Sequence, residues 1–332
     1  MPELRLNLIS REWVIIPQKS ARKPGEFRVK GNRKHRAEYE PSCPFCKGNE
    51  STTPKALVTL PPEGEWKMRV TPNKFPYLSA DGPRERVNEG LRRKVSGVGK
   101  HEVIIESPYH DVPMALMPIE DVEAIMYLYR DRFRAAFDDR RVYNVIIFKN
   151  HGAEAGSTIV HPHSQLIGSP VIPLEIRYRV DEAMRYFDNT GLCIMCATME
   201  DELRDSQRVV VINDSFMSFV PYAALSPFHM WIFPRRHMPS FANTTDDELI
   251  DLAEVVKETL QRLYYGLDDP SFNMVLRSLS PYRSRSEYIH WYISIVPRVS
   301  STPGFEMGTG IYVNQAIPEQ VAEFLREVNL PD

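Results

Sequence analysis

All four cysteines of the chain fall in two Cys-x-x-Cys pairs, Cys43 with Cys46 and Cys193 with Cys196. No apolar stretch of signal-peptide length precedes them, so we expect a metal-binding knuckle at each pair rather than a framework of disulfides. A redox-active pair is the alternative, but neither pair follows the βαβ pattern that is typical of one. Because a structural zinc ion takes four ligands, each pair needs two more from elsewhere in the chain.

The two halves of the sequence repeat one pattern, which supplies those ligands. In each half an apolar segment ends in a proline closely followed by a histidine, Pro108-Tyr-His110 in the first half and Pro234-Arg-Arg-His237 in the second. A stretch with helical apolar periodicity, an Asp-Asp pair and a further apolar segment follow in both halves. The repeat closes on a histidine, His161 lying 51 residues after His110 and His290 lying 53 residues after His237. The chain is therefore predicted to be a tandem duplication.

Each half of the duplication offers two cysteines and two histidines, a complete set of soft ligands that leaves no coordination position open. We expect two structural zinc ions per chain, each joining a knuckle to the sheet of its own half. The alternative for His110 and His237 is that both are surface histidines at the end of a strand. The predicted ligands are Cys43, Cys46, His110 and His161 in the first half, and Cys193, Cys196, His237 and His290 in the second.

The two copies differ beside the last ligand. In the sequence His161-Pro-His163-Ser-Gln, a strand would place both imidazoles on one face, so one ring can hold a metal while the other stays free. Aligning His161 with His290 puts Tyr292 opposite His163. The second copy thus keeps the inferred ligand and loses the free imidazole. We expect one active site per chain, in the first half, with His163 as nucleophile or base.

A chain of 332 residues, 42% hydrophobic and 26% charged, is typical of a globular protein with two domains or one doubled unit. Each half is predicted to be an α+β unit, an antiparallel sheet with one long helix, which begins near Pro118 in the first half and at a capping box from Thr245 in the second. Prolines at 170 and 173 indicate the boundary. We expect a catalytic domain over residues 1–175 and a second domain over residues 176–332.

Charge and hydropathy exclude several classes of protein. The net charge is -3 and long runs of Lys and Arg are absent, which disfavours nucleic-acid binding. A zinc-ribbon protein that binds nucleic acid stays the alternative from another class, and it would need a basic face with exposed aromatic residues. Nowhere do 18 apolar residues run together, so no membrane association is expected and a cytoplasmic location follows.

The motif His161-Pro-His163-Ser-Gln165, with Asn150-His-Gly152 and Gly156-Ser-Thr158 before it, resembles the active-site strand of the galactose-1-phosphate uridylyltransferase family, a branch of the histidine-triad superfamily. The resemblance runs nearly from end to end, and the stretch Gly304-Phe-Glu-Met-Gly-Thr-Gly looks closest to the ADP-glucose phosphorylase subgroup. It implies two histidine-triad-like units, with antiparallel sheets flanked by helices, and a homodimer.

The resemblance also implies a ping-pong reaction on nucleoside diphosphate sugars and sugar 1-phosphates. His163 would attack the α-phosphorus, release a sugar 1-phosphate and carry the nucleotide to a second sugar phosphate or to inorganic phosphate. Transfer of UMP between UDP-glucose and a hexose 1-phosphate is the first choice, and ADP-sugar phosphorolysis is the alternative. A hydrolase of the same superfamily is a further possibility.

The same resemblance assigns site residues. Gln165 and Ser164 would donate hydrogen bonds to the transferring phosphoryl group. Lys74 stands where uridylyltransferases often have an acidic residue, which puts specificity for uracil in doubt. His101 and His229 are expected to be satisfied by backbone partners. The further predicted substrate contacts are Asn150, Gly152, Ser157 and Thr158 for the phosphates, Asn73 and Phe75 for the base and ribose, Phe305 and Glu306 for the sugar, and Arg22 and Lys23 for phosphate.

Several of these contacts have a plainer alternative. Asn73 and Phe75 could form a turn before a strand, and Glu306 could be an ordinary surface carboxylate. Arg22 and Lys23 could be a solvated pair of charges.

Overall fold

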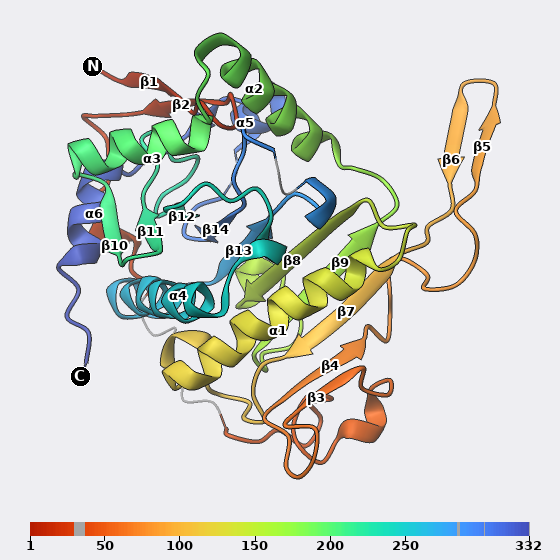
Figure 1. Cartoon of the computed structure of the whole chain (residues 1–332). Helices are drawn as coiled ribbons and strands as arrows, with labels where there is room; N and C mark the ends of the chain where they lie inside the picture. Colours follow the sequence, from red (N-terminus) through yellow and green to blue (C-terminus); the bar gives the residue numbers. More distant parts are fainter. Residues whose placement is uncertain (30–36, 284–285, 302, 332) are drawn as a thin grey trace.

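The computed structural model describes residues 1–29, 37–283, 286–301 and 303–331 of the chain. Its centre is one continuous antiparallel sheet of ten strands, in the order β10-β11-β12-β14-β13-β8-β9-β7-β4-β3 (Figure 1). The first half of the sequence supplies β3 (Val58–Leu60), β4 (Met68–Pro72), β7 (Lys100–Ile105), β8 (Asn144–His151) and β9 (His163–Ser169). The second half supplies β10 (Val209–Ile212), β11 (Phe216–Phe219), β12 (Met230–Pro234), β13 (Phe272–Arg277) and β14 (Tyr292–Pro297).

The two halves join where β8 pairs with β13. At this junction Asn150 lies opposite Asn273, and the side-chain amide of Asn273 donates to Asn150 Oδ1 over 2.7 Å. The predicted α+β architecture of two antiparallel units flanked by helices is confirmed. The sheets of the two units form a single sheet, so both units present their corresponding faces to the same side of the molecule.

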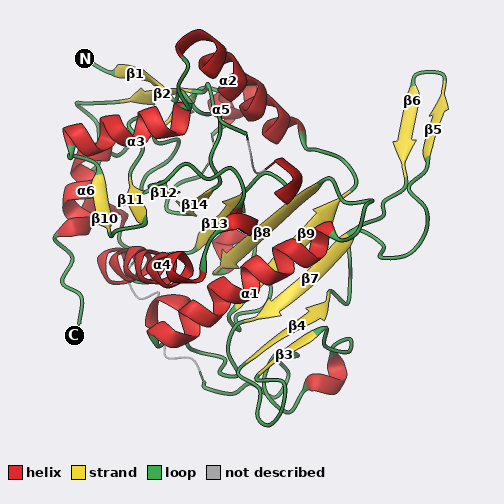
Figure 2. Cartoon of the chain, in the orientation of Figure 1, coloured by secondary structure: helices red, strands yellow, loops and turns green. Residues whose placement is uncertain are grey.

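Two long helices, α1 (Ile119–Phe137) and α4 (Asp246–Leu267), lie side by side over one face of the sheet (Figure 2). The apolar stripe of α1 is fully buried there, as its periodicity predicts. The predicted capping box at the start of α4 is confirmed: the Thr245 hydroxyl accepts from the backbone N–H of Glu248, whose carboxylate accepts from the N–H of Thr245. This layer of helices closes one face of the sheet along both halves.

The opposite face is covered unequally. Side chains alternate along each strand, so every strand also presents residues to this second face. In the second half α2 (Leu174–Thr190) and α3 (Ile194–Asp205) cover it and form a separate apolar cluster with Phe219, Trp231 and Tyr292. In the first half this face holds an open cleft.

Smaller elements surround the sheet. β1 (Glu3–Leu6) and β2 (Trp13–Ile16) form a three-stranded sheet with β15 (Tyr312–Val313), next to α5 (Gly304–Thr309) and α6 (Pro318–Arg326). The hairpin of β5 (Arg86–Glu89) and β6 (Arg92–Val95) projects from the body of the molecule (Figure 1). Within the described residues, none of the helices combines the length and the apolar character that a membrane span requires.

Candidate active site and metal clusters

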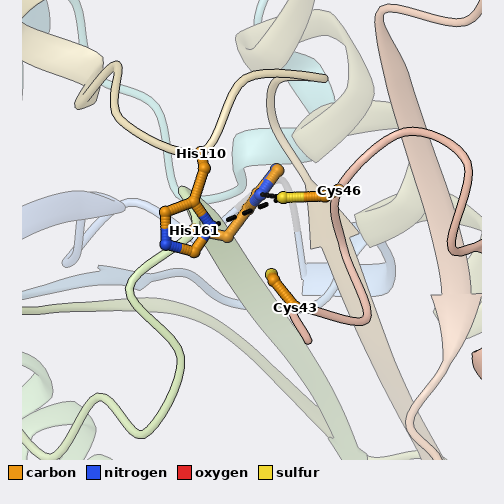
Figure 3. Close-up of side chains that lie close together, drawn as sticks. All are labelled: Cys43, Cys46, His110 and His161. Carbon is orange, nitrogen blue, oxygen red and sulfur yellow. Dashed lines mark hydrogen bonds between the residues drawn. The ribbon is translucent and has the colours of Figure 1, made fainter. Parts of the chain in front are cut away.

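The first cluster of metal-ligating side chains brings together Cys43, Cys46, His110 and His161, the four residues predicted from the repeat (Figure 3). One ligand atom of each residue lies within 4.8 Å of the other three. Cys46 Sγ is 3.5 Å from Nδ1 of His110 and 3.5 Å from Nδ1 of His161. Two thiolates and two imidazoles around one point are the donor set of a tetrahedral metal site, so these residues could hold a metal ion.

His161 is oriented for this task by its second nitrogen. Its Nε2 lies 2.7 Å from the carbonyl oxygen of Ser107, so Nε2 carries the proton and Nδ1 faces the cluster. Burial lowers the pKa of His161 to about 4, which keeps the ring in the neutral form that binds metals.

The second cluster consists of Cys193, Cys196, His237 and His290, again within 4.8 Å of one another. His237 repeats the arrangement of the first half, because its Nε2 contacts a backbone carbonyl, that of Ser286, at 2.9 Å. His290 differs, since it presents Nε2 to Cys196 Sγ at 3.0 Å. Both predicted sets of four residues therefore converge, and they use different ring nitrogens at the last position.

His163 lies at the start of β9, two residues beyond the first cluster, and is 9% exposed. Its Nδ1 is 2.8 Å from the carbonyl oxygen of His161. A carbonyl can only accept, so Nδ1 carries the proton and Nε2 keeps a free lone pair. Burial lowers the pKa of His163, although the hydrogen bond to the His161 carbonyl opposes that effect. The ring is thus a neutral imidazole with one nitrogen prepared as a nucleophile.

A cleft of about 580 Å³ opens beside His163. Its walls are the knuckle around Phe45, the ends of β4 and β9, and the loop after β8. The Phe45 ring packs edge-on against His163 with 5.2 Å between ring centroids. The predicted catalytic and substrate-binding residues that line this cleft are Asn73, Phe75, Asn150, Thr158, His163 and Gln165.

Ser164 does not line the cleft, which corrects the expectation that it donates to a phosphoryl group. Because side chains alternate along β9, Ser164 points to the helix-covered face, where it is 1% exposed. Its hydroxyl contacts Glu106 and the Tyr129 hydroxyl there. The prediction placed three consecutive polar residues in one site, whereas a strand can present only the first and third to the same side.

Beneath β9 lies a buried ion pair that was not predicted from the sequence. Lys149 Nζ is 2.5 Å from Glu106 Oε2 and also donates to the carbonyl of His163 at 3.2 Å. Burial raises the pKa of the Glu106 carboxyl, but the charge of Lys149 and the hydrogen bonds that Glu106 accepts outweigh it and lower the pKa below its usual value. The signal was a charged residue directly after each of two apolar runs, Val103-Ile-Ile before Glu106 and Ile146-Ile-Phe before Lys149.

The ring nitrogens of His101 were expected to hydrogen-bond to backbone groups, and only one of them does. Its Nδ1 accepts from the backbone N–H of Tyr77 at 3.1 Å, but its Nε2 lies 2.8 Å from Gln165 Oε1. His229, in the second half, contacts the Ser294 hydroxyl at 2.9 Å rather than a backbone group. Each of the two histidines therefore forms a hydrogen bond with one side chain on the neighbouring strand.

Other predicted contacts lie elsewhere within the described part of the chain. A Cβ on Gly152 would meet Ser271 Oγ at 2.1 Å, so this glycine serves the close approach of two loops rather than the cleft. The Ser157 hydroxyl donates to the Ile159 carbonyl at 2.7 Å. Glu306 accepts from the backbone N–H of Val313 at 2.7 Å. The cleft lining, as far as the structure describes it, includes none of Gly152, Ser157, Arg22, Lys23, Phe305 and Glu306.

The corresponding surface of the second half is filled. Tyr292 takes the strand position of His163 and is 3% exposed, and its hydroxyl accepts from Arg179 of α2 at 2.5 Å. Its ring packs against Trp231 and Phe233, with centroids 5.7 and 5.5 Å away. In the second half, the Tyr292 side chain and helix α2 thus fill the space that corresponds to the open cleft beside His163.

Comparisons with known proteins agree along the whole chain. The family model described as galactose-1-phosphate uridyl transferase, N-terminal domain, matches residues 1–173, and the model of its C-terminal domain matches residues 179–294. ADP-glucose phosphorylase of Arabidopsis thaliana is 34% identical over 99% of this chain and 93% of its own length. Galactose-1-phosphate uridylyltransferase of Thermotoga maritima is 26% identical over 99% of both chains.

Solved structures show the same two relationships. The crystal structure of an ADP-glucose phosphorylase from Arabidopsis thaliana with bound ADP-glucose superposes with a TM-score of 0.83 at 32% identity, covering 100% of both chains. A structure described as uridylyltransferase superposes with a TM-score of 0.75 at 26% identity, covering 99% of this chain and 98% of the other. Both similarities extend over the ten-stranded sheet and its helices.

Replacing Lys149 by Met would leave the Glu106 carboxylate buried without its counter-charge. We expect Lys149→Met to lower the free energy of unfolding by about 3–5 kcal/mol. The double variant Lys149→Met with Glu106→Gln removes both charges, and we expect it to lose less free energy of unfolding than Lys149→Met alone. Urea denaturation, followed by fluorescence, measures both values.

Lys94→Met is the matched control, because Lys94 and its partner Glu89 are both well exposed on the projecting hairpin. We expect it to change the free energy of unfolding by at most about 1 kcal/mol. Equal losses for Lys94→Met and Lys149→Met would show that the buried pair does not stabilise β9.

Proposed function

This chain belongs to the galactose-1-phosphate uridylyltransferase family, and on that premise we propose that it is a nucleotidyltransferase that acts on nucleoside diphosphate sugars and sugar 1-phosphates. The observation that carries the proposal is the state of His163. Its Nδ1 proton is held by the His161 carbonyl, and its Nε2 lone pair faces a cleft of a size suited to a nucleotide sugar.

In the first half-reaction, His163 Nε2 attacks the α-phosphorus of the nucleotide sugar. A P–N bond forms while the bond from the α-phosphorus to the bridging oxygen breaks, and that oxygen leaves as part of the sugar 1-phosphate. The imidazole ring gains positive charge as the P–N bond forms. The His161 carbonyl, which accepts from Nδ1 at 2.8 Å, stabilises that charge.

The second half-reaction reverses these steps with another acceptor. A phosphate oxygen of a sugar 1-phosphate or of inorganic phosphate attacks the same phosphorus, the P–N bond breaks, and the electron pair returns to Nε2. Hydrogen-bond donors around the phosphorus support both steps, because phosphoryl transfer depends mainly on positioning and on stabilisation of charge. Gln165, Thr158 and Asn150 are the side chains at the cleft that supply these contacts.

For the nucleotide, uridine is the first candidate. The relatives named galactose-1-phosphate uridylyltransferase include the Thermotoga maritima protein, which matches this chain over its whole length. Phe75 and Tyr77 are 77% and 78% exposed at the cleft, where their rings offer a surface on which a base can stack. Transfer of UMP between UDP-glucose and a hexose 1-phosphate is the corresponding reaction.

ADP-sugar phosphorolysis is the second candidate. It is favoured by the 34% identity to ADP-glucose phosphorylase of Arabidopsis thaliana. Lys74 favours it as well, because it lines the cleft at a position where uridylyltransferases often carry an acidic residue. In this reaction inorganic phosphate, rather than a sugar phosphate, removes the nucleotide from His163.

We further propose zinc in both clusters, with a structural role. Each cluster supplies four protein donors, so a bound zinc ion has no position left for substrate. The first zinc would fix the knuckle that carries Phe45, and with it one wall of the cleft. Zinc would supply rigidity there, while the transfer itself runs through His163.

We also propose a homodimer. The open face of the sheet between the two halves carries the partly exposed apolar residues Phe148, Val275 and Val296 on adjacent strands. On α5, Phe305 and Met307 are 49% and 80% exposed. Exposed apolar side chains of this kind favour contact with another protein surface. A second copy of the chain would cover them and could bring Phe305 and Glu306 to the neighbouring cleft.

Labelling tests the proposed reaction. We expect nucleotide sugar labelled at the α-phosphate to leave an acid-labile label on the wild-type chain and none on His163→Ala, which lacks the nucleophile. UDP-glucose and ADP-glucose are offered separately, and the one that labels the chain identifies the nucleotide. As a control, the same compound labelled in glucose should leave the protein unlabelled, because the sugar 1-phosphate departs. Equal labelling of His163→Ala would remove His163 as the nucleophile.

Metal analysis tests the clusters. We expect about two zinc ions per wild-type chain and about one in Cys196→Ser, whose first cluster stays intact. Cys46→Ser should also retain about one zinc, and it should lose labelling of His163 because the Phe45 wall is released. About one zinc in the wild type, unchanged in Cys196→Ser, would contradict the second site.

Sedimentation equilibrium tests the dimer. We expect twice the mass of one chain for the wild type, and a shift toward the monomer for Met307→Lys, because the charge would be placed in the interface. Leu91→Lys at the tip of the projecting hairpin is the control, since Leu91 is fully exposed and far from the proposed interface. A wild-type protein with the mass of one chain would refute the proposal.

A further inference from the structure

We propose that His101 is a positioning residue for the transfer reaction: it fixes the side-chain amide of Gln165 so that the amide NH2 group, and not its oxygen, faces the α-phosphate bound at His163. This inference rests on the proposed function and adds a residue to it. His101 lies on β7, the strand next to β9, and is 6% exposed.

One hydrogen-bond donor beside His101 is fixed by its chemistry. The backbone N–H of Tyr77 points at His101 Nδ1 over 3.1 Å, and a backbone N–H can only donate. His101 Nδ1 is therefore an acceptor. In a neutral imidazole the proton must then sit on the other nitrogen, Nε2. Burial lowers the pKa of His101, which favours the neutral ring.

The proton on Nε2 decides the orientation of Gln165. Nε2 lies 2.8 Å from one end of the Gln165 amide, which must be the acceptor end, the oxygen Oε1. Asn73 is oriented by the N–H of Phe75, which donates to its Oδ1 at 2.8 Å, so its Nδ2 is a donor. That Nδ2 lies 3.1 Å from His101 Nε2 and 3.3 Å from the same Gln165 oxygen, and it donates to the oxygen because Nε2 already carries a proton. Two donors thus hold the Gln165 oxygen, and its NH2 group remains for the cleft.

The orientation matters because the two ends of an amide have opposite charge. With NH2 toward the phosphoryl oxygens, Gln165 stabilises the charge that develops on them during transfer. With the amide turned by half a rotation, the oxygen would face those phosphoryl oxygens and repel them. Shape alone cannot distinguish the two orientations, since the amide N and O are nearly equal in size. The hydrogen-bond donors are what select one of them.

The second half of the chain offers an internal control. In the first half, Val103 pairs with Gln165 across the strands, and His101 lies two residues before Val103. In the second half, Trp231 pairs with Ser294, and His229 lies two residues before Trp231. His229 Nε2 contacts Ser294 Oγ at 2.9 Å. The histidine and its hydrogen bond are present in both copies, but only in the first copy is the bonded side chain an amide at an open cleft.

The test uses the first half-reaction in single-turnover rapid-quench experiments, with whichever α-labelled nucleotide sugar labels the wild-type chain. His101→Asn can still accept from the Tyr77 N–H but has no donor that reaches Gln165. We expect it to slow nucleotide transfer to His163 by about 10- to 100-fold, at or below the effect of deleting an oxyanion donor. His101→Gln places an amide N–H where Nε2 was and should stay within about threefold of the wild type.

Two further variants separate positioning from general damage to the fold. His229→Asn removes the equivalent bond in the second half and should leave the transfer rate within about twofold of the wild type. In a Gln165→Ala background, His101→Asn should cost less than about twofold more, because His101 acts only through Gln165. His101→Phe, which keeps a ring against Tyr77, carries the same expectations as His101→Asn if that variant does not fold.

Thermal melting and zinc content establish that each variant is folded. The inference is overturned if His101→Asn transfers nucleotide at the wild-type rate, or if it slows the Gln165→Ala protein as much as it slows the wild type. Slowing by His101→Gln equal to that by His101→Asn would also overturn it. A wild-type chain that takes no label from either nucleotide sugar is a different result, which overturns the proposed function and this inference with it.

Discussion

The hydrogen bond from His163 Nδ1 to the carbonyl of His161 is the contact on which the site depends. His161 directs its own ring to the first metal cluster and its carbonyl to the nucleophile, so one residue couples the two. The knuckle completes this arrangement, because Phe45 lies in the sequence between the cluster residues Cys43 and Cys46, and its ring packs on the His163 ring. A metal ion in the cluster would therefore hold the nucleophile in place without touching the substrate.

The side chains of β9 alternate between two different environments. His163 and Gln165 face the cleft, while Ser164 joins the buried pair of Glu106 and Lys149 on the other side. Lys149 also donates to the backbone carbonyl of His163, so the buried charges restrain the strand directly below the nucleophile. Burying two charges is costly unless they are paired and hydrogen-bonded, and here the ion pair is supported by hydrogen bonds to Glu106 from Tyr129 and Ser164 and from Lys149 to the His163 carbonyl.

The duplication explains why one sheet carries a single open cleft. Both units keep a Cys2His2 cluster and a histidine that binds the adjacent strand, which shows how closely the second unit follows the first. The second unit has Tyr292 at the position of His163, the proposed nucleophile, and covers it with α2, so apolar packing fills the space. The uncovered face of the first unit is then the side of the sheet available to substrate and, in the proposed dimer, to a second chain.

The sequence by itself determined the duplication, the two sets of two cysteines and two histidines that converge, and the two long helices, and it singled out His163 as the proposed nucleophile, because these inferences depend on residue type and spacing. It could not determine which polar neighbours of His163 share its face, and so it placed Ser164 beside Gln165. It also left His101 without a partner and missed the pairing of Glu106 with Lys149, since these contacts join strands far apart in the chain. Register between strands decides such contacts, and register is fixed only when the whole sheet packs against its helices.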